Sequence, residues 1–280
     1  MRIFVTGACG YIGAMLVERA LQAGHEVVGL DNLLHGGHPT LFDLAGHPGL
    51  RFVRGDIRER GRLMELLAEA KPDAVVHLAA IVGAPACRMD PERAAAVNIT
   101  GTSVVLSALR ETCPDAHFVF ASTDSVYGQI EGPCTEDAAL HPLTEYGRDK
   151  EVAERMVRGT AHRYTILRFA TAFGLARRPR LDLLINDCVW RAVKNRHLIV
   201  YEAEFQRSFL DVSDIVRAVL LVLEQHQVTV GQTYNVGDDR LNASKAEVAN
   251  LVAEAVPKTT VSLLGEGRDL DQRDYTPDHS

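Results

Sequence analysis

The sequence has few cysteines and lacks the spacings that would join them in one site. Its five cysteines are odd in number and widely scattered, and no two of them form a Cys-x-x-Cys pair. This pattern suggests neither a disulfide framework nor a zinc site, and we expect no bound metal. No apolar run reaches the length that spans a membrane, so we expect no membrane partner.

The chain also lacks an excess of basic charge. Its 280 residues carry 30 Lys and Arg against 37 Asp and Glu, which gives a formal net charge of −7. Without a long basic run, this balance argues against a general nucleic-acid binder, and we expect no nucleic-acid partner. The first apolar run begins at residue 2, which leaves no room for a signal peptide, so a reduced, cytoplasmic setting is the simplest expectation.

Through its first half the sequence alternates apolar runs with helical patterns. The predicted strands cover residues 2–6, 26–30, 51–54, 73–78, 117–121 and 164–168. The predicted helices cover residues 11–23, 58–70 and 91–112, and one more precedes the last strand. Continuous apolar strands that alternate with helices imply a parallel sheet covered on both faces. The expected fold class is α/β, with a Rossmann-type doubly wound parallel sheet over residues 1–168.

The second half is less regular, and we expect it to form mainly a smaller C-terminal α/β lobe over residues 169–280. The predicted elements are helices at 182–193 and 213–225, strands at 198–201 and 233–236, and a helix opened by the capping box Ser244-Lys-Ala-Glu247. Such a lobe would lie over the carboxyl ends of the parallel strands, where these sheets bind ligands. The tail from Gly265 is polar and looks frayed or cut short.

A glycine-rich turn, Gly7-Ala-Cys-Gly10-Tyr-Ile-Gly13, lies between the first predicted strand and the first predicted helix. Glycines here permit a tight turn, close approach of the backbone to a pyrophosphate, and close packing of the helix on the strand. The start of the helix adds free N–H groups and a partial positive charge. This context favours a dinucleotide-binding turn over a merely structural one.

Asp31 ends the second predicted strand, 18 residues after Gly13, where it can accept hydrogen bonds from both ribose hydroxyls of a dinucleotide. A carboxylate there repels a 2′-phosphate, so we predict NAD rather than NADP as the cofactor. Asp56-Ile57 would place a second carboxylate near the adenine amino group, and the small residues of Leu78-Ala79-Ala80 would let the dinucleotide lie against the backbone. Ordinary turn and strand-end roles are the alternative for these residues.

Tyr146 and Lys150 lie four residues apart, which puts them on the same face of a helix. An ammonium close to a phenol stabilises the phenolate and lowers the Tyr pKa from its usual value of about 10. A Tyr tuned in this way can take a proton from a sugar or alcohol hydroxyl near neutral pH. The spacing alone also fits a surface Tyr beside a solvated Lys, and it gains weight from the cofactor site upstream.

The order of these features resembles the extended short-chain dehydrogenase/reductases that act on nucleotide sugars, the nucleotide-sugar epimerase/dehydratase family. The resemblance covers nearly the whole chain and is carried by the glycine turn, Asp31, Asp56-Ile57, Leu78-Ala79-Ala80, Asn98-Ile-Thr-Gly101-Thr102, Ala121-Ser-Thr-Asp-Ser-Val-Tyr-Gly128 and Tyr146-xxx-Lys150. It implies that Tyr146 deprotonates a sugar hydroxyl, usually at C4, and that Lys150 binds the nicotinamide ribose. It also implies that Thr123 hydrogen-bonds the reacting oxygen, although Thr123 taken alone suits a strand-end cap.

The same resemblance implies further ligand contacts. For the cofactor it adds Tyr11, Ile12, Asn32 and Asn98. For a nucleotide-diphosphate sugar as substrate it implies Cys87, Ser125, Thr171, Asn186, Arg207 and Arg273. Arg207 is the first choice for a charge-assisted contact with the sugar-nucleotide pyrophosphate, and a solvated surface charge is the alternative for either arginine. A homodimer is implied as well, built on apolar stripes within 104–108 and 152–157 that also suit a core face.

The chain departs from this family where the reaction is decided. Relatives that dehydrate or decarboxylate usually carry a Glu two residues after the Thr, whereas this chain has Thr123-Asp124-Ser125. Because epimerisation needs only the oxidising residues and room for the ketose to turn over, we predict an NAD-dependent epimerase of UDP- or dTDP-hexoses that acts through a 4-keto intermediate. Thr171 also stands where relatives commonly carry an Asn.

Two alternatives stay open. The first is a nucleotide-sugar dehydratase in which Asp124 is the acid and a Cys87 thiolate the base, although a buried, inert Cys87 is the commoner case. The second is a non-catalytic NAD-sensing regulator, which should lack a working Tyr146/Lys150 pair.

Overall fold

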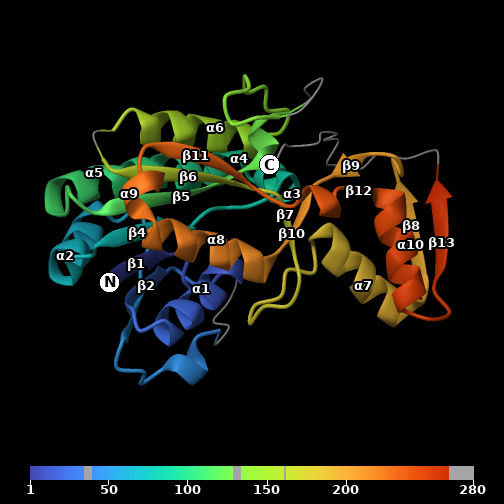
Figure 1. Cartoon of the computed structure of the whole chain (residues 1–280), viewed down its shortest axis with the longest axis horizontal. Helices are drawn as coiled ribbons and strands as arrows, with labels where there is room; N and C mark the ends of the chain where they lie inside the picture. The colour runs from blue at the N-terminus through green and yellow to red at the C-terminus, as the bar shows by residue number, and fades with distance from the viewer. Residues whose placement is uncertain (35–39, 129–133, 161, 265–280) are drawn as a thin grey trace.

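The computed structural model describes residues 1–34, 40–128, 134–160 and 162–264, and its centre is a seven-stranded sheet in the order β11-β6-β5-β4-β1-β2-β3 (Figure 1). Every neighbouring pair in this sheet is parallel. Its strands are β1 (Arg2–Thr6), β2 (Glu26–Asp31), β3 (Leu50–Arg54), β4 (Ala74–His77), β5 (His117–Thr123), β6 (Tyr164–Phe169) and β11 (Gln232–Val236). The predicted Rossmann-type parallel sheet is confirmed.

Helices cover both faces of this sheet (Figure 1). They are α1 (Tyr11–Gln22), α2 (Arg60–Ala70), α3 (Ala84–Met89), α4 (Pro91–Ala95), α5 (Thr102–Thr112), α6 (Glu145–Arg158), α8 (Val212–Glu224) and α9 (His226–Thr229). Short 3₁₀ turns lie at η1 (Phe42–Leu44), η3 (Asp124–Val126) and η4 (Asp239–Leu241).

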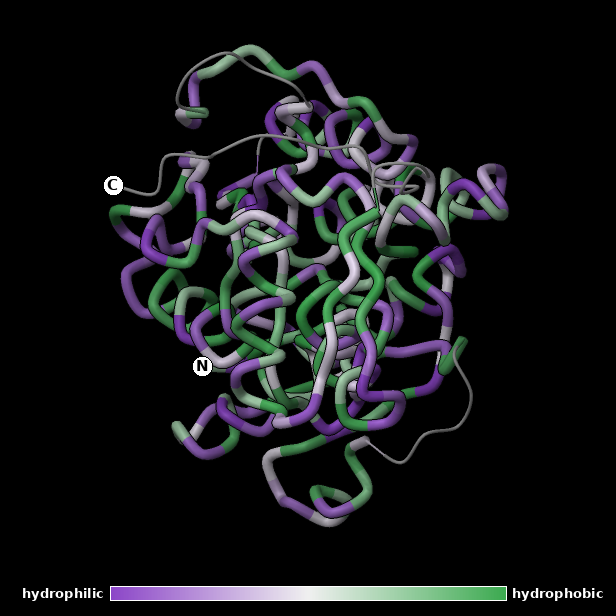
Figure 2. The backbone as a smooth tube through the Cα atoms, turned by 90° about the vertical axis from the view of Figure 1, so that its right-hand side faces the viewer, coloured by the Kyte–Doolittle hydropathy of each residue, from purple (hydrophilic) through white to green (hydrophobic). Residues whose placement is uncertain are grey.

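The strands are apolar on both faces, and this is why helices pack on both. Ile3 and Val5 belong to the core shared with α1 and α8, whereas Phe4 between them belongs to the core shared with α2, α5 and α6. Successive side chains of a strand point to opposite faces, so a continuous apolar run fills two cores at once. Figure 2 shows hydrophobic stretches of the backbone alternating with hydrophilic ones along the chain.

The strand order reverses beside β1. The chain runs from β1 to β2 and β3 on one side, then returns to β4 and continues to β5 and β6 on the other. The loops that leave the carboxyl ends of β1 and β4 therefore turn in opposite directions and leave a crevice, which is where such sheets bind ligands.

A smaller lobe lies at one end of the molecule (Figure 1, right). In it, α7 (Leu184–Asn195) and α10 (Lys245–Ala255) pack with β8 (His197–Tyr201) and β13 (Thr260–Leu264) around a separate apolar core. Short strand pairs join β9 (Gln206–Arg207) to β12 (Ala243–Ser244), and β7 (Thr171–Phe173) to β10 (Phe209–Asp211). The Ser244–Glu247 capping box forms at the start of α10 as predicted.

Two of our expectations are wrong in detail. The helix and strand predicted at 213–225 and 233–236 are not part of the smaller lobe, because β11 pairs with β6 and α8 packs into the core that holds α1. The helix predicted at 91–112 is not regular either, because a π-helical turn, η2 (Ala96–Gly101), separates α4 from α5. A π turn inserts one extra residue per turn and often marks a functional position.

The apolar stripes expected at a dimer interface belong mostly to the protein's own core. Val105, Leu106, Ala108 and Val157 are all buried against the sheet. Val104, Val152 and Met156 are partly exposed. The homodimer therefore stays a prediction.

Candidate active site

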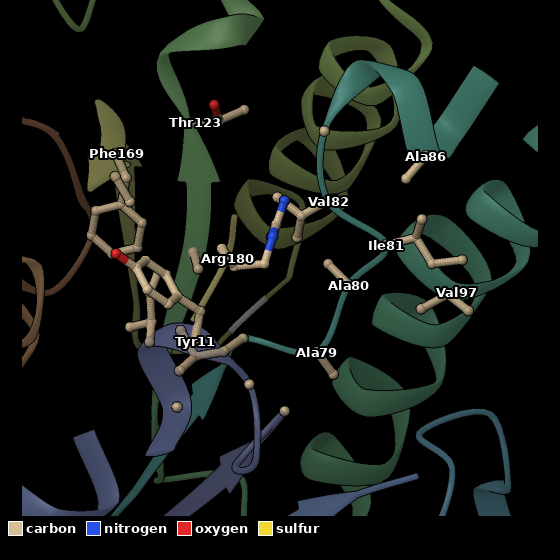
Figure 3. Close-up of a pocket in the computed structure, with 18 of the residues that line it drawn as sticks. Tyr11, Ala79, Ala80, Ile81, Val82, Ala86, Val97, Thr123, Phe169 and Arg180 are labelled. Atoms are coloured by element: carbon tan, nitrogen blue, oxygen red, sulfur yellow. The ribbon is translucent and has the colours of Figure 1, made fainter. Parts of the chain in front are cut away.

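A cavity of about 510 Å³ opens at the carboxyl ends of the parallel strands (Figure 3), a volume typical of small-molecule sites. Most of the residues predicted to bind the cofactor or to react lie in its wall: Gly7, Gly10, Tyr11, Ile12, Gly13, Asp31, Asn32, Asp56, Ile57, Leu78, Ala79, Ala80, Thr123, Asp124, Ser125, Tyr146, Lys150 and Thr171. The fold therefore brings together residues that are up to 164 positions apart in the chain.

The glycine turn forms a cradle that a side chain would fill. Gly7 has φ +73°, in the left-handed region, and a Cβ added to it would lie 2.8 Å from the Ala79 nitrogen. A Cβ on Gly13 would lie 2.1 Å from the Gly7 oxygen. Because Gly10 caps α1 without a side-chain hydrogen bond, the first N–H groups of the helix stay open toward the cavity. This backbone fits the pyrophosphate of a dinucleotide.

Asp31 is held in place by the backbone around it. Its Oδ2 accepts a 2.9 Å hydrogen bond from the Cys9 N–H, and its Oδ1 accepts a 2.8 Å bond from the Leu33 N–H. A carboxylate oxygen can accept more than one hydrogen bond, so Asp31 can still accept from ribose hydroxyls in the cavity. Its orientation fits the predicted contact with NAD.

Asp56 is fixed in a similar way by side chains. The Arg58 guanidinium binds both of its oxygens, at 2.9 and 2.8 Å, and Asn32 Nδ2 donates to Asp56 Oδ2 at 3.1 Å. The hydrogen bonds from Arg58 hold the pKa of Asp56 well below its usual range. Asp56 is therefore a charged acceptor at the cavity wall, as a contact with an adenine amino group requires.

Tyr146 and Lys150 project from α6 on the same side and both line the cavity. Thr144 caps α6 by accepting the Gly147 N–H at 3.1 Å, and a Cβ on Gly147 would lie 2.6 Å from the Ser125 oxygen. This close approach seats the first turn of α6 on the turn after β5. Lys150 is only 4% exposed, and burial lowers the pKa of its ammonium to about 8.

The turn that follows β5 completes the reaction end of the cavity. Thr123 Oγ1 accepts the Ser125 N–H at 3.2 Å, and it also lies 3.0 Å from Ser125 Oγ and 3.3 Å from Asp124 Oδ1. All three residues are buried, and all three line the cavity. The local bonds fix the Thr123 hydroxyl in the wall that also carries Tyr146, where a sugar oxygen can meet both.

Cys87 does not line the cavity, although it was expected to contact substrate. It is fully buried, and its thiol donates to the Ile81 carbonyl at 3.4 Å. Burial raises the pKa of the thiol to about 12. The burial of the thiol and its raised pKa disfavour a thiolate base at this position and favour the inert alternative for Cys87.

Asn98 lies behind the cavity wall rather than in it. Its Oδ1 accepts the Ile81 N–H at 2.8 Å, and its Nδ2 donates to the Ile81 carbonyl at 3.0 Å and to Asp149 Oδ2 at 3.1 Å. Asn98 sits in the π-helical turn η2, and these bonds tie η2 to the segment leaving β4 and to α6. It positions two walls of the cavity, and no cofactor contact is assigned to it.

Two other predicted substrate contacts, Asn186 and Arg207, are not among the described residues that line the cavity. Asn186 Oδ1 accepts the Gly174 N–H at 3.0 Å and its Nδ2 donates to the Arg180 carbonyl at 3.0 Å, so it supports the segment between β7 and α7. Arg207 is 3% exposed and donates to the Gln206 carbonyl, and it is not among the lining residues. Arg273 lies outside the described residues.

The segment between β7 and α7 lines the cavity although it was not predicted to do so. Arg178, Pro179, Arg180, Asp182 and Leu183 all line the cavity. Arg180 reaches into it (Figure 3) and binds the Asp182 carboxylate with two hydrogen bonds, of 2.7 and 2.5 Å. The available signal was local, because three arginines within four residues (177, 178 and 180) are unusual in a chain of negative net charge.

The part of the chain that the structure describes was also expected to hold neither a metal nor a membrane-spanning segment. No group of three or more His, Cys, Asp or Glu side chains there is placed to hold a metal ion. No helix in the same ranges is both long and apolar enough to cross a membrane.

Known proteins share this sequence pattern and fold. The NAD-dependent epimerase/dehydratase family matches residues 3–237. The dTDP-glucose 4,6-dehydratase of Xanthomonas campestris pv. campestris (strain B100) is 33% identical over 249 residues, which cover 83% of this chain and 70% of that protein. The UDP-glucose 4-epimerase of Thermotoga maritima, solved with UDP-glucose, gives a TM-score of 0.89 at 25% identity, covering 100% of this chain and 90% of that one. The dTDP-glucose 4,6-dehydratase of Streptomyces venezuelae, solved with NAD, gives a TM-score of 0.87 at 27% identity. The match covers 100% of this chain and 88% of that one.

Proposed function

The chain belongs to the NAD-dependent epimerase/dehydratase family, and on that premise we propose that it epimerises C4 of a UDP- or dTDP-hexose through a 4-keto intermediate. The observation that carries this proposal is a cavity wall that holds Tyr146, Lys150 and Thr123 but has Ser125 where a dehydrating relative would carry a Glu. The residues that support oxidation at C4 are present. The Glu that dehydrating relatives usually carry is not.

The chain's own residues would hold and move the proton of the C4 hydroxyl. NAD, when bound, would accept the hydride from C4 and return it to the other face of the ketone. Tyr146 takes the hydroxyl proton, and the Lys150 ammonium stabilises the phenolate through its charge. Thr123 donates to the C4 oxygen and keeps it near Tyr146. After the ketose turns over, Tyr146 returns the proton to the C4 oxygen of the opposite epimer.

A 4,6-dehydratase is the second candidate, and Asp124 is the observation that favours it. Its side chain is 2% exposed and lines the cavity next to Thr123, where it could protonate a leaving C6 hydroxyl. The weakness of this candidate is the base for the C5 proton. Cys87 is outside the cavity with a raised pKa, and Ser125 has no carboxylate to offer.

Incubation with a panel of UDP- and dTDP-hexoses in deuterated water separates the two reactions. We expect a C4 epimer of unchanged mass, without deuterium at C5, when the product is analysed by mass spectrometry and NMR. Loss of water together with deuterium at C5 would replace the epimerase with the dehydratase.

The Tyr146→Phe variant separates both enzymes from a regulator that only binds NAD. Loss of the base should lower kcat by about 10²- to 10⁴-fold while NAD affinity is kept. Tyr164→Phe, on β6 and outside the cavity wall, is the matched control and should stay active. Full biological function in the Tyr146→Phe variant would instead support the regulator.

We also propose that the protein works in the cytoplasm as a homodimer in which α5 and α6 of two copies meet. Val104, Val152 and Met156 are the partly exposed apolar residues that support this surface. Light scattering should give the mass of a dimer for the native chain and of a monomer for Val152→Asp. A monomeric native chain would exclude the dimer. Cell fractionation tests the location, and the protein should appear in the cytoplasmic fraction.

A further inference from the structure

The segment between β7 and α7 is fastened to the opposite side of the cavity by Arg177. Its Nε lies 2.9 Å from Glu18 Oε2 and its Nη2 lies 3.1 Å from Glu18 Oε1, so the guanidinium grips a carboxylate of α1 with two bonds. Its Nη1 also donates to Asp43 in η1. These contacts join residues more than 130 positions apart and bring the segment across the cofactor end of the cavity.

Arg178, the next residue, lines the cavity and has no anionic partner. Three cations line this cavity among the described residues: Lys150, Arg178 and Arg180. Lys150 donates to the Ala121 carbonyl, and Arg180 is paired with Asp182. Within the same described ranges, no residue forms a hydrogen bond or ion pair with the Arg178 guanidinium.

Such a cation is unfavourable without a ligand. Burial and the nearby charge of Arg180 both lower the pKa of Arg178. Asp31, Asp182 and Cys9 act on it in the opposite direction. A half-buried guanidinium that no carboxylate binds directly is stabilised when an anion forms hydrogen bonds with it.

The position of Arg178 indicates which anion this is. Its electrostatic neighbours Cys9 and Asp31 belong to the glycine turn and to the end of β2. The turn offers open N–H groups to a pyrophosphate, whereas the Asp31 carboxylate would repel a phosphate placed on the adjacent ribose. Arg178 and the start of α1 therefore both line the cavity beside the glycine turn.

We propose that Arg178 is a clamp on the pyrophosphate of the bound dinucleotide, supplied by the segment after β7 and held over the glycine turn by the Arg177–Glu18 ion pair. This requires NAD binding and is independent of whether the sugar is epimerised or dehydrated. The proposal gives a cofactor contact to the segment between β7 and α7, whose sequence contains no cofactor-binding motif.

Titration calorimetry on the cofactor-free protein tests the clamp without any turnover. Arg178→Gln should raise the Kd for NAD and for ADP-ribose by the same factor, about 10- to 100-fold, because both ligands contain the pyrophosphate. Arg178→Lys should recover part of the affinity, because it keeps the charge. Arg217→Gln is the matched control, since that arginine is exposed on α8 and should leave both Kd values unchanged.

The Arg177–Glu18 ion pair is tested separately, by the rate at which NADH leaves the protein. Glu18→Gln should speed the release of NADH several-fold in stopped-flow fluorescence. The variant keeps the Arg178 side chain but weakens the ion pair that holds its segment over the glycine turn. If the Arg178→Gln variant does not fold, by circular dichroism, the Glu18→Gln and Arg178→Lys variants still decide. Unchanged Kd values for NAD and ADP-ribose in a folded Arg178→Gln variant would overturn the proposal, and so would unchanged NADH release in Glu18→Gln.

Two other anions would give different results. If Arg178→Gln weakened NADP binding but left NAD unchanged, the arginine would face a 2′-phosphate, and the clamp would be wrong. If it weakened UDP or dTDP alone, the arginine would belong to the sugar nucleotide, and the clamp would again be wrong.

Discussion

Lys150 Nζ donates a 2.7 Å hydrogen bond to the backbone carbonyl of Ala121, in the last part of β5. The bond holds a buried ammonium on the side of α6 that carries Tyr146, and burial lowers the pKa of this ammonium to about 8. The Lys150 charge is therefore complete well below pH 8 and is lost as the pH rises through 8. Stabilisation of the Tyr146 phenolate by that charge should follow the same course.

We expect kcat to fall as the pH is raised from 7 to 9.5, with a midpoint near the Lys150 pKa of about 8. In Lys150→Arg the guanidinium stays charged across this range, so the fall should disappear, even if the rate is lower throughout. A profile of kcat against pH for the two proteins checks this. The same alkaline fall in Lys150→Arg would mean that another group titrates.

The glycine cradle leads to a second prediction. A methyl group on Gly13 would lie 2.1 Å from the Gly7 oxygen, so Gly13→Ala must displace the turn that faces the pyrophosphate. We expect NAD affinity to fall by at least about tenfold in calorimetry, since the backbone can no longer approach the phosphates. Gly24→Ala is the comparison, because its Cβ would meet no atom within 4 Å and it lies outside the cavity. Gly24 has φ +81°, so this variant should lose some stability but keep its NAD affinity.

Residues at fixed spacings beside a strand or helix end were predicted well. The glycine turn, Asp31 and the Tyr146/Lys150 pair all line the cavity, because strand–turn–helix geometry fixes where they point once the strand is buried. These positions depend on local chemistry, and local chemistry is present in the sequence.

Positions set by tertiary packing were not predicted. Arg178 lines the cavity next to Arg177, which binds Glu18 across 159 residues, and no periodicity encodes such a contact. Asn98 was expected to touch the cofactor, but the π-helical turn directs its amide to Ile81 instead. β11 was assigned to the smaller lobe because its short apolar run does not say which sheet it joins.

Cys87 gives a third prediction. Its thiol is buried, bonded to the Ile81 carbonyl and absent from the cavity wall, so it takes no part in proton transfer. Cys87→Ala should keep kcat within about twofold of the native value while losing about 1 kcal/mol of stability through the small cavity that it leaves. Steady-state kinetics and urea unfolding measure the two quantities. A large loss of kcat, with loss of deuterium exchange at C5, would return Cys87 to the role of a base.

The last prediction concerns a buried ion pair beneath the reaction centre. Arg168 and Glu154 are each 1% exposed, with Arg168 Nε 3.0 Å from Glu154 Oε1 and Nη2 2.8 Å from Oε2. Ser122, which lines the cavity, donates to the same carboxylate at 2.5 Å. The pair therefore links β6, α6 and the end of β5, where Thr123 follows.

Removing one partner leaves the other charge buried and uncompensated. Glu154→Gln should therefore lower the free energy of unfolding by about 3–5 kcal/mol in urea titrations. Glu69→Gln breaks an ion pair with Arg51 that is about half exposed on both sides, and it should cost less than about 1 kcal/mol. A double variant, Glu154→Leu with Arg168→Met, should recover part of the loss, because it removes both buried charges. Equal small losses in Glu154→Gln and Glu69→Gln would show that the buried pair carries no special weight in the fold.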